Sequence, residues 1–274
     1  RRITRLAVPL LVTWLSLNVL QVWVLARLNG IDLLTALGNG IPLYHLWFLF
    51  DLIIFTGAAA LVLPWVDRAG RARWRFLDAV PLIGVIAMAA GLGFVVNTAI
   101  RATGIAYESI GGLTSLYRLV TYAPFFAAGI LMFRWAGMRA RFVNVPFYLL
   151  AVTVPLAIAA ASHTKSATLA VRELALFIEM VMVWLSVGAV LNFFSRHLSR
   201  DSRLSRYLSE SAYSIFLFHH PIVLVLGIAM LPLPLGAWLK FTLICAGTLA
   251  LSVAAHELLV RRSPALRFSF NGKR

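Results

Sequence analysis

Residues 209–227, read as SESAYSIFLFHHPIVLVLG, are apolar over the length of a membrane-spanning helix and carry two adjacent histidines about halfway along. At about 1.5 Å of rise per residue, a helix that starts at the first of these residues places His219 and His220 about 15 Å along, close to the middle of the bilayer. Ionisable groups are costly there, which makes an inward-facing histidine a candidate functional residue. Pro221 follows at once and should free a backbone carbonyl beside the pair. The alternative is that both histidines only hydrogen-bond neighbouring helices.

The rest of the composition agrees with a membrane protein. Of the 274 residues, 61% are hydrophobic and 13% are charged, with a mean hydropathy of +0.87. Soluble domains do not have this balance. The single cysteine, Cys245, excludes an intrachain disulfide and a cysteine-based metal site.

Apolar windows of membrane-spanning length recur along the whole chain. They fall at about residues 6–28, 42–65, 78–98, 113–133, 144–162, 173–195, 209–231 and 237–259. The runs are continuous, whereas the strands of a membrane β-barrel alternate polar and apolar residues. We therefore predict an all-α, polytopic helical bundle of eight spans, forming one transmembrane domain over residues 1–274 with no soluble domain.

The basic residues indicate how the bundle is oriented. The net charge is +15, and the 25 Lys and Arg residues lie mainly in the termini and in alternate loops on one side of the predicted spans. The positive-inside rule places that side, and both termini of this chain, in the cytoplasm. The basic charge therefore indicates topology and attraction to anionic lipid head groups, and we expect no nucleic-acid partner.

The opening segment RRITRLAVP places Arg1, Arg2 and Arg5 on one side of a helix. Three guanidinium groups at a cytoplasmic helix entry could converge on a phosphate group. The spacing equally fits arginines that extend to the lipid head groups.

On the outer side, the segment PLYHLWFLFDLIIF carries His45 and Trp47 near a helix entry. Trp47 fits the aromatic belt at a membrane interface. His45 is expected at a shallower depth than the central histidine pair. The outer loop 97–114 carries Glu108 and two glycines, and Arg118 follows just inside the next span. Because glycine lets a backbone approach a ligand closely, this loop could line a sugar-sized opening. A plain solvated loop is the alternative.

These residues resemble a known family. RRITRLAVP resembles the Arg-Arg-x-x-Arg…Pro segment of the membrane acyltransferase-3 family, and residues 211–221 resemble its Ser-x-Tyr-x-Ile-Tyr-Leu-x-His-x-Pro signature, with Phe216 in place of the second tyrosine. His45-Leu46-Trp47-Phe48-Leu49, the double histidine and residues 268–273 most resemble the glucans biosynthesis protein C branch, whose members transfer succinyl groups to osmoregulated periplasmic glucans.

The resemblance implies an O-acyltransferase of a bacterial inner membrane with both termini of this chain cytoplasmic. Acyl-CoA would be a co-substrate, the acyl group succinyl or acetyl, and the acceptor a glycan hydroxyl. No bound cofactor or metal is expected. Arg1, Arg2 and Arg5 would hold the phosphates of CoA. His219, His220 and His45 would support catalysis by binding the thioester, polarising its carbonyl or orienting the base. Trp47, Glu108 and Arg118 would lie on the acceptor side.

The same resemblance indicates that residues precede Arg1. The family places its principal catalytic histidine in the first span, about ten residues after an arginine, whereas RRITRLAVP resembles the entry to the third span. Ten spans less two equals the eight predicted here, and the chain lacks an initiator methionine. We therefore expect this chain to be inactive by itself.

Two other classes of protein fit part of the pattern. A transporter or flippase for a glycan or lipid carrier would also have eight spans, polar groups at mid-membrane and a basic inner surface. It does not explain a histidine pair beside a helix-breaking proline. A haem-carrying membrane subunit would need two axial histidines at matched depth, and the expected shallower position of His45 argues against that.

Overall fold

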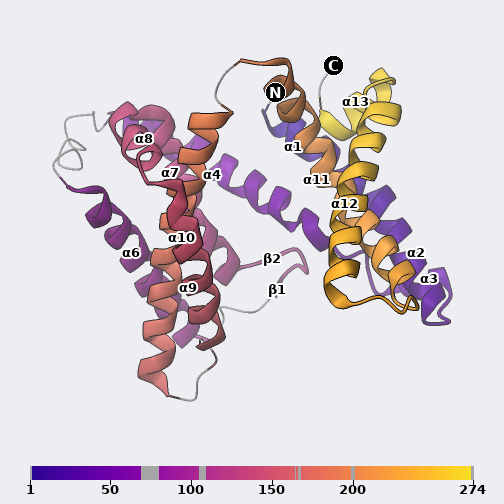
Figure 1. The fold of residues 1–274 in the computed structure, drawn as a ribbon, viewed down its shortest axis with the longest axis horizontal. Helices are drawn as coiled ribbons and strands as arrows, with labels where there is room; N and C mark the ends of the chain where they lie inside the picture. The colour runs from indigo at the N-terminus through magenta and orange to yellow at the C-terminus, as the bar shows by residue number, and fades with distance from the viewer. Residues whose placement is uncertain are drawn as a thin grey trace. The chain divides into compact units, whose positions relative to one another are not determined.

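The computed structural model describes residues 2–68, 80–104, 109–163, 165, 168–198 and 201–272. Within these ranges the protein is built of helices, joined by turns and accompanied by one short two-stranded ribbon (Figure 1). The predicted all-α, polytopic membrane architecture is confirmed.

The described ranges contain seven helical stretches that are long and apolar enough to cross a membrane. They are Ile3–Leu28, Tyr44–Asp67, Leu82–Ala102, Leu116–Arg134, Leu169–His197, Arg203–Met230 and Ala237–Val260. Ala136–Val143 and Phe147–His163 pass the same test together and are bent by 60°. Pro146 lies at this bend, and the residue before a proline is disfavoured in a helix. Counted as one broken span, this pair is the eighth, and each predicted window coincides with one of the eight.

The chain forms two compact units. The first consists of Arg1–Gly57 together with Asp201–Arg274, and the second of Ala58–Arg200. The first unit therefore joins the beginning of the chain to its end. The single domain over residues 1–274 stays a prediction.

The first unit begins with one long helical span in three segments. These are α1 (Arg2–Thr13), a π-helical turn (Trp14–Asn18) and α2 (Val19–Leu28). After a loop that contains α3 (Leu33–Gly38), a 3-10 turn (Tyr44–Leu46) leads into α4 (Trp47–Arg68). A π-helical turn inserts one extra residue into a helix and is frequent at functional sites.

The remainder of the first unit comes from the end of the chain. It contains α11 (Arg203–Met230), α12 (Ala237–Ala255), a π-helical turn (His256–Val260) and α13 (Pro264–Asn271). A reciprocal capping box between Ser202 and Ser205 defines the start of α11. Ser263 caps α13, and Pro264 occupies its first position, where a missing N–H costs nothing.

Helix α13 packs against the beginning of α1. Gly272 ends α13 with φ +59°, and a Cβ placed on it would lie 2.6 Å from Arg5 Cα. Tyr213 on α11 donates a hydrogen bond to the Arg5 carbonyl oxygen at 3.3 Å. The rings of Phe218 and Phe270 lie 5.0 Å apart. At position 272, only glycine combines a positive φ with so close an approach to the Arg5 backbone.

The second unit contains the middle of the chain. After the last turns of α4 come α6 (Leu82–Ala102), β1 (Ser109–Ile110), β2 (Thr114–Ser115), α7 (Leu116–Arg134), α8 (Ala136–Val143), a 3-10 turn (Phe147–Leu149), α9 (Leu150–His163) and α10 (Leu169–His197). The two strands pair antiparallel, and Gly111 and Gly112 between them both have positive φ. Positive φ is the conformation that tight hairpin turns require of their central residues.

The core of the second unit is aromatic and apolar. It is formed by Ile86, Ala90, Met138, Phe142 and Trp184. Trp184 stacks on Phe125 with ring centroids 4.3 Å apart and an interplanar angle of 18°. Buried aromatic area of this kind stabilises a helix bundle strongly.

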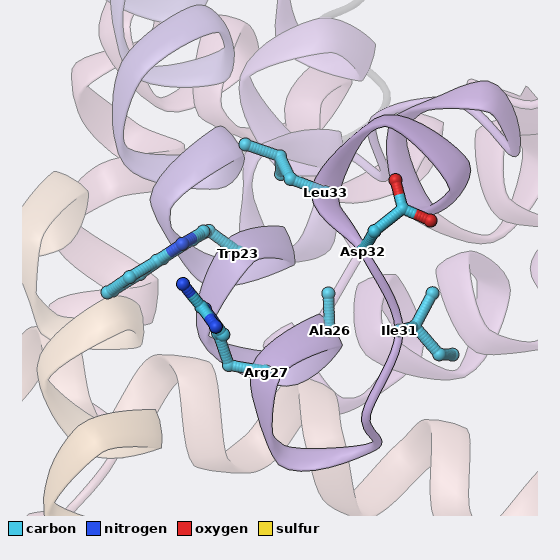
Figure 2. Close-up of a pocket in the computed structure, with 6 residues that line it drawn as sticks. All are labelled: Trp23, Ala26, Arg27, Ile31, Asp32 and Leu33. Carbon is cyan, nitrogen blue, oxygen red and sulfur yellow. The ribbon is translucent and has the colours of Figure 1, made fainter.

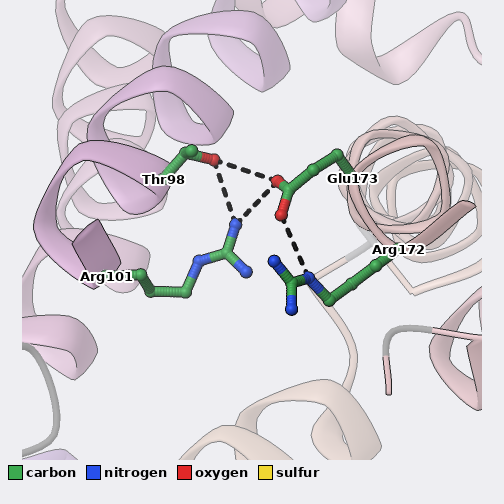
Figure 3. A network of polar contacts seen from close by, with 4 residues as sticks. All are labelled: Thr98, Arg101, Arg172 and Glu173. Carbon is green, nitrogen blue, oxygen red and sulfur yellow. Dashed lines mark hydrogen bonds and ion pairs between the residues drawn. The ribbon is translucent and has the colours of Figure 1, made fainter. Parts of the chain in front are cut away.

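An ion-pair network joins α6 to α10 in the second unit (Figure 3). Glu173 Oε2 accepts hydrogen bonds from Arg101 Nη2 at 2.9 Å and from Thr98 Oγ1 at 3.3 Å. Its other oxygen accepts from Arg172 Nε at 3.2 Å. One carboxylate therefore holds two guanidinium groups at the ends of two neighbouring helices.

Candidate functional site

Three imidazoles meet in the interior of the first unit. The rings of His45 and His220 are stacked, with centroids 4.8 Å apart and planes 13° apart. The His219 ring meets the His45 ring edge-on at 5.0 Å. The structure thus brings together the three histidines selected from the sequence, although their catalytic roles stay a prediction.

The expectation that His45 lies at a shallower depth than the histidine pair is wrong. His45 belongs to the 3-10 turn before α4, and the loop before that turn is tied into the helical bundle. Trp14 Nε1 donates to the Ile41 carbonyl at 2.8 Å, and Asn18 Nδ2 donates to the Pro42 carbonyl at 2.8 Å. These two bonds hold the chain against the first helical span, so α4 begins at the level of the histidine pair.

The ring nitrogens of His45 are enclosed by the protein but unpaired within the described ranges. Both Nδ1 and Nε2 are buried and have no hydrogen-bond partner among the residues the structure describes. The Leu217 backbone interacts with this imidazole without reaching hydrogen-bond geometry. Leu217 is also the residue whose carbonyl loses its helical partner because Pro221, four residues later, has no N–H. A buried imidazole without a hydrogen-bond partner reduces the stability of the fold.

Tyr44 carries backbone strain directly beside the cluster. Its φ is +45°, the only positive value at a non-glycine residue in the described ranges. Its ring stacks on His220 with centroids 5.4 Å apart. Strained conformations of this kind persist where the surrounding structure enforces them, and they concentrate at functional sites.

A chain of hydrogen bonds reaches His220 from the first helical span. His220 Nδ1 lies 2.5 Å from Gln21 Oε1, and Gln21 Nε2 donates to Asn18 Oδ1 at 3.1 Å. Asn18 continues the chain to the Pro42 carbonyl. Gln21 and Asn18 are 1% and 0% exposed. Neither residue was predicted from the sequence, although a glutamine and an asparagine within an apolar span are a signal of a buried polar site.

A second buried polar cluster lies in the first unit, where α11, α13 and the π-helical turn His256–Val260 meet. Ser214 Oγ donates to Asn271 Oδ1 at 2.8 Å and lies 3.0 Å from His256 Nδ1. All three residues are buried. His256 was also missed by the sequence analysis, because nothing in the hydropathy pattern shows which face of its helix points inward.

The predicted donor-binding arginines are only partly described. Arg5 is exposed on α1, and its carbonyl accepts the bond from Tyr213. Arg1 and the side chain of Arg2 lie outside what the structure describes. The convergence of the three guanidinium groups therefore stays a prediction.

The predicted acceptor-side residues lie in different units. Trp47 is half-buried at the start of α4, two residues after His45, and its ring meets that of Phe48 at 6.2 Å. Arg118 belongs to the second unit, where its Nη2 donates to the Leu113 carbonyl at 2.6 Å. Glu108 lies outside the described residues. A shared acceptor site for these three residues stays a prediction.

A small pocket lies at the end of α2 in the first unit (Figure 2). Its volume is about 220 Å³, and it is lined by Trp23, Ala26, Arg27, Ile31, Asp32 and Leu33. Hydrogen bonds from the Thr35 hydroxyl and backbone N–H lower the pKa of the Asp32 carboxyl. The pocket therefore presents a carboxylate, a guanidinium group and an indole.

Among the described residues, no group of three or more His, Cys, Asp or Glu side chains is arranged to hold a metal ion. The His45 and His220 rings are stacked, and the His219 ring meets both of them edge-on. What this arrangement offers chemically is therefore proton transfer and hydrogen bonding by imidazole.

Comparison with known proteins identifies the family of this chain. The Acyl_transf_3 family model, described as an acyltransferase domain, matches residues 1–257. Glucans biosynthesis protein C of Shigella dysenteriae serotype 1 (strain Sd197) is 26% identical, over 99% of this chain and 74% of the relative. The protein of the same name from Escherichia coli O9:H4 (strain HS) is also 26% identical, over 84% of this chain and 61% of the relative.

No solved structure shows a significant match to the chain. The family model nevertheless covers every residue of the imidazole cluster and all of the helices from α1 to α12. This coverage supports an acyltransferase. The chain belongs to the acyltransferase-3 family of multi-pass membrane proteins.

Proposed function

We propose that the protein is a membrane O-acyltransferase that moves a succinyl or acetyl group from cytoplasmic acyl-CoA to a hydroxyl of an extracytoplasmic glycan. The observation that carries the proposal is the cluster of His45, His219 and His220 inside the helical bundle of a chain from this family. The relatives named glucans biosynthesis protein C favour a glucan as the acceptor, and we propose that it is an osmoregulated one.

Acyl transfer to a hydroxyl needs a base at the site of reaction. The hydroxyl oxygen attacks the thioester carbonyl carbon, a C–O bond forms, and the C–S bond breaks. The hydroxyl proton passes to the base, and the CoA thiolate leaves and takes up a proton. Imidazole suits this exchange because it gains and loses a proton near neutral pH. An imidazole nitrogen can also carry the acyl group briefly in place of direct transfer.

Burial of the cluster supports the same chemistry. The nitrogens of His45 are shielded from solvent and unpaired. A site closed to water keeps a reactive thioester from hydrolysis and strengthens each polar interaction within it. If the His45 imidazole only stabilised helix packing, its nitrogens would be expected to have hydrogen-bond partners.

On the donor side, Arg1, Arg2 and Arg5 would bind the phosphates of CoA by charge-assisted hydrogen bonds. The exposure of Arg5 on α1 fits this role. On the acceptor side, Trp47 would stack on the apolar face of a sugar, and Glu108 and Arg118 would bind its hydroxyls. Outer arginines would receive the free carboxylate of a succinyl group.

The proposed location is the bacterial inner membrane with both termini of this chain in the cytoplasm. The basic residues support this orientation, because positively charged loops are retained on the cytoplasmic side. Acyl-CoA, the glycan acceptor and membrane lipids are the proposed partners. Acyl-CoA would act as a co-substrate, with no resident cofactor.

One assay separates this function from glycan or lipid-carrier transport. Membranes that contain the protein are incubated with acyl-CoA labelled in the acyl group, and the outer glycan is analysed for covalent label. If the proposal is correct, the glycan carries the label, and alkaline hydrolysis of the ester releases it. If glycan crosses the membrane but carries no label, the protein is a transporter and this proposal is wrong.

A second experiment tests the donor site. Replacing Arg1, Arg2 and Arg5 together by glutamine in the full-length protein should raise the apparent KM for acyl-CoA at least tenfold, because each lost charge-assisted bond to phosphate contributes about 1.5–3 kcal/mol. Arg203 and Arg206, at the start of α11, provide a control with a similar loss of basic charge. Unchanged donor kinetics in the triple variant would remove the proposed role of these arginines.

A further inference from the structure

We infer that Gln21 and Asn18 are positioning residues that hold the proton of neutral His220 on Nδ1, so that Nε2 is the proton-accepting atom of the imidazole cluster. The mechanistic use of this atom rests on the proposed acyl transfer. The hydrogen-bond chain itself does not depend on that function.

The Pro42 carbonyl determines which groups donate and which accept along this hydrogen-bond chain. A carbonyl oxygen only accepts hydrogen bonds, so the Asn18 side chain must present its NH₂ group to it, at 2.8 Å. Asn18 Oδ1 then points the other way and accepts from Gln21 Nε2 at 3.1 Å. Reversing either amide would bring two oxygens or two N–H groups together.

The last bond in the chain assigns the tautomer of His220. With the Gln21 NH₂ group occupied by Asn18, Gln21 Oε1 faces His220 Nδ1 at 2.5 Å. This oxygen can only accept, so Nδ1 carries the hydrogen. A neutral imidazole carries one hydrogen, and Nε2 is therefore left with a free lone pair.

His219 also carries its hydrogen on Nδ1, for an independent reason. Its Nδ1 lies 2.6 Å from the Phe216 carbonyl oxygen, which also can only accept. Neither Nε2 atom of the pair has a hydrogen-bond partner among the described residues. Neutral His219 and His220 therefore both present acceptors, and neither can polarise a thioester carbonyl by donating a hydrogen bond from Nε2.

The chain is built so that it cannot easily rearrange. Asn18 and Gln21 are almost completely buried, so a flipped amide would lose its partners without gaining water. Asn18 ends the π-helical turn Trp14–Asn18, where the extra residue changes which side chains face inward. This π-helical turn interrupts the long first span. It therefore supplies Asn18, the first side chain of the hydrogen-bond chain.

The consequence for acyl transfer is a division of roles. His220 Nε2 accepts a hydrogen bond from the acceptor hydroxyl or from the principal base and so orients it, and Nδ1–H holds the ring in place through Gln21 Oε1. The stacked His45 ring lies against His220, and both of its nitrogens are buried without a hydrogen-bond partner among the described residues.

The test is nitrogen NMR of the protein labelled with ¹⁵N-histidine, in lipid nanodiscs at neutral pH, with His220 assigned by the loss of its signals in His220→Asn. The expected result is a pyrrole-type Nδ1 and a pyridine-type Nε2 at His220. In Gln21→Leu, which removes the acceptor, the Nε2–H form should appear and kcat should fall at least about tenfold, the rate equivalent of one lost hydrogen bond.

Two further variants separate positioning from structure. Gln21→Glu keeps an oxygen that faces Nδ1 and should keep the hydrogen on Nδ1, but it loses the bond to Asn18 Oδ1, so kcat should fall less than in Gln21→Leu. Asn29→Ala removes an exposed amide that bonds only to the Leu25 carbonyl at the end of α2, and it should change neither the tautomer nor the rate. The KM for acyl-CoA should stay within about twofold in all these variants.

A predominant Nε2–H form at His220 in the unsubstituted protein would overturn the inference, even if Gln21→Leu failed to fold. An unchanged tautomer in folded Gln21→Leu would also overturn it. The expected tautomer together with no acyl transfer by the full-length protein would remove the proposed function and leave the hydrogen-bond chain intact. Acyl transfer together with the Nε2–H tautomer would support the proposed function and overturn the inference about the hydrogen-bond chain.

Discussion

The imidazole of His45 lies parallel to that of His220, with 4.8 Å between ring centroids, although the two residues are far apart in the sequence. His45 comes from the turn before α4 and His220 from the middle of α11. The contact therefore exists only because the beginning and the end of the chain fold into one unit. Each residue has a distinct predicted contribution to stability and to activity.

Replacing His45 by phenylalanine should reduce activity without reducing stability. Phenylalanine keeps ring contacts with Phe216 and His220 but removes two buried nitrogens that have no partner. Leaving a buried polar group unsatisfied costs about 1–3 kcal/mol, so the melting temperature in detergent should hold or rise. Acyl transfer should fall about 10²-fold or more if His45 takes part in proton transfer. Full activity in a stable variant would exclude that role.

Replacing His220 by asparagine should remove activity while the helix packing survives. The asparagine Nδ2 lies near the position of His220 Nδ1 and can still donate to Gln21 Oε1, whereas the atom corresponding to Nε2 is lost. We expect about a 10²- to 10⁴-fold loss of kcat and a change in unfolding free energy below about 1 kcal/mol. Thermal unfolding beside the labelled-glycan assay measures both. A variant that keeps its rate would contradict the assignment of Nε2.

Replacing Gly272 by alanine should loosen the contact between α13 and α1. The added Cβ would meet the Arg5 backbone at 2.6 Å, and the left-handed conformation costs about 1–2 kcal/mol for a residue with a side chain. The melting temperature should therefore fall. Gly227→Ala is the matched control, because its Cβ meets nothing within 4 Å and alanine favours a helix interior by about 0.5–1 kcal/mol. Equal effects of the two substitutions would contradict the proposed close approach.

Replacing Glu173 by alanine should destabilise the second unit. The change leaves Arg101 and Arg172 without the carboxylate that joins them, and the Arg101 and Glu173 side chains are only 18% and 20% exposed. We expect a loss of about 1–3 kcal/mol in a double-mutant cycle with Arg101. The control is Asp201→Ala, which breaks an ion pair to Arg206 whose side chains are 78% and 67% exposed and which should change stability by less than about 1 kcal/mol.

The Asp32 cap of α3 should make a pH-dependent contribution to local stability. Bonds from the Thr35 hydroxyl and backbone N–H hold the pKa of this carboxyl below its ordinary value in the folded state. The contribution is therefore fully present above the unfolded-state pKa and is lost as the pH falls through the lower, folded-state pKa. Thr35→Val should raise the Asp32 pKa towards its ordinary value, as measured by ¹³C NMR of the carboxyl group. An unchanged titration would show that the hydroxyl does not lower it.

Some of the site could be predicted from the sequence because depth in a membrane is a local property. The length of the apolar run around His219 and His220 gave their place along a span, and Pro221 marked the carbonyl it frees. His45 was selected as a site residue, but its depth was misjudged. The hydropathy pattern does not show that Trp14 and Asn18 hold the preceding loop against the bundle.

The sequence by itself determined the all-helical membrane class and the positions of the spans, because continuous apolar length fixes both within each segment. Only the tertiary structure decided which side chains face one another. Gln21 and His220 are 199 residues apart, and His256 meets Ser214 across two helices. Such contacts depend on the rotation and packing of whole helices against one another. In a uniformly apolar span the hydropathy pattern leaves that rotation undetermined.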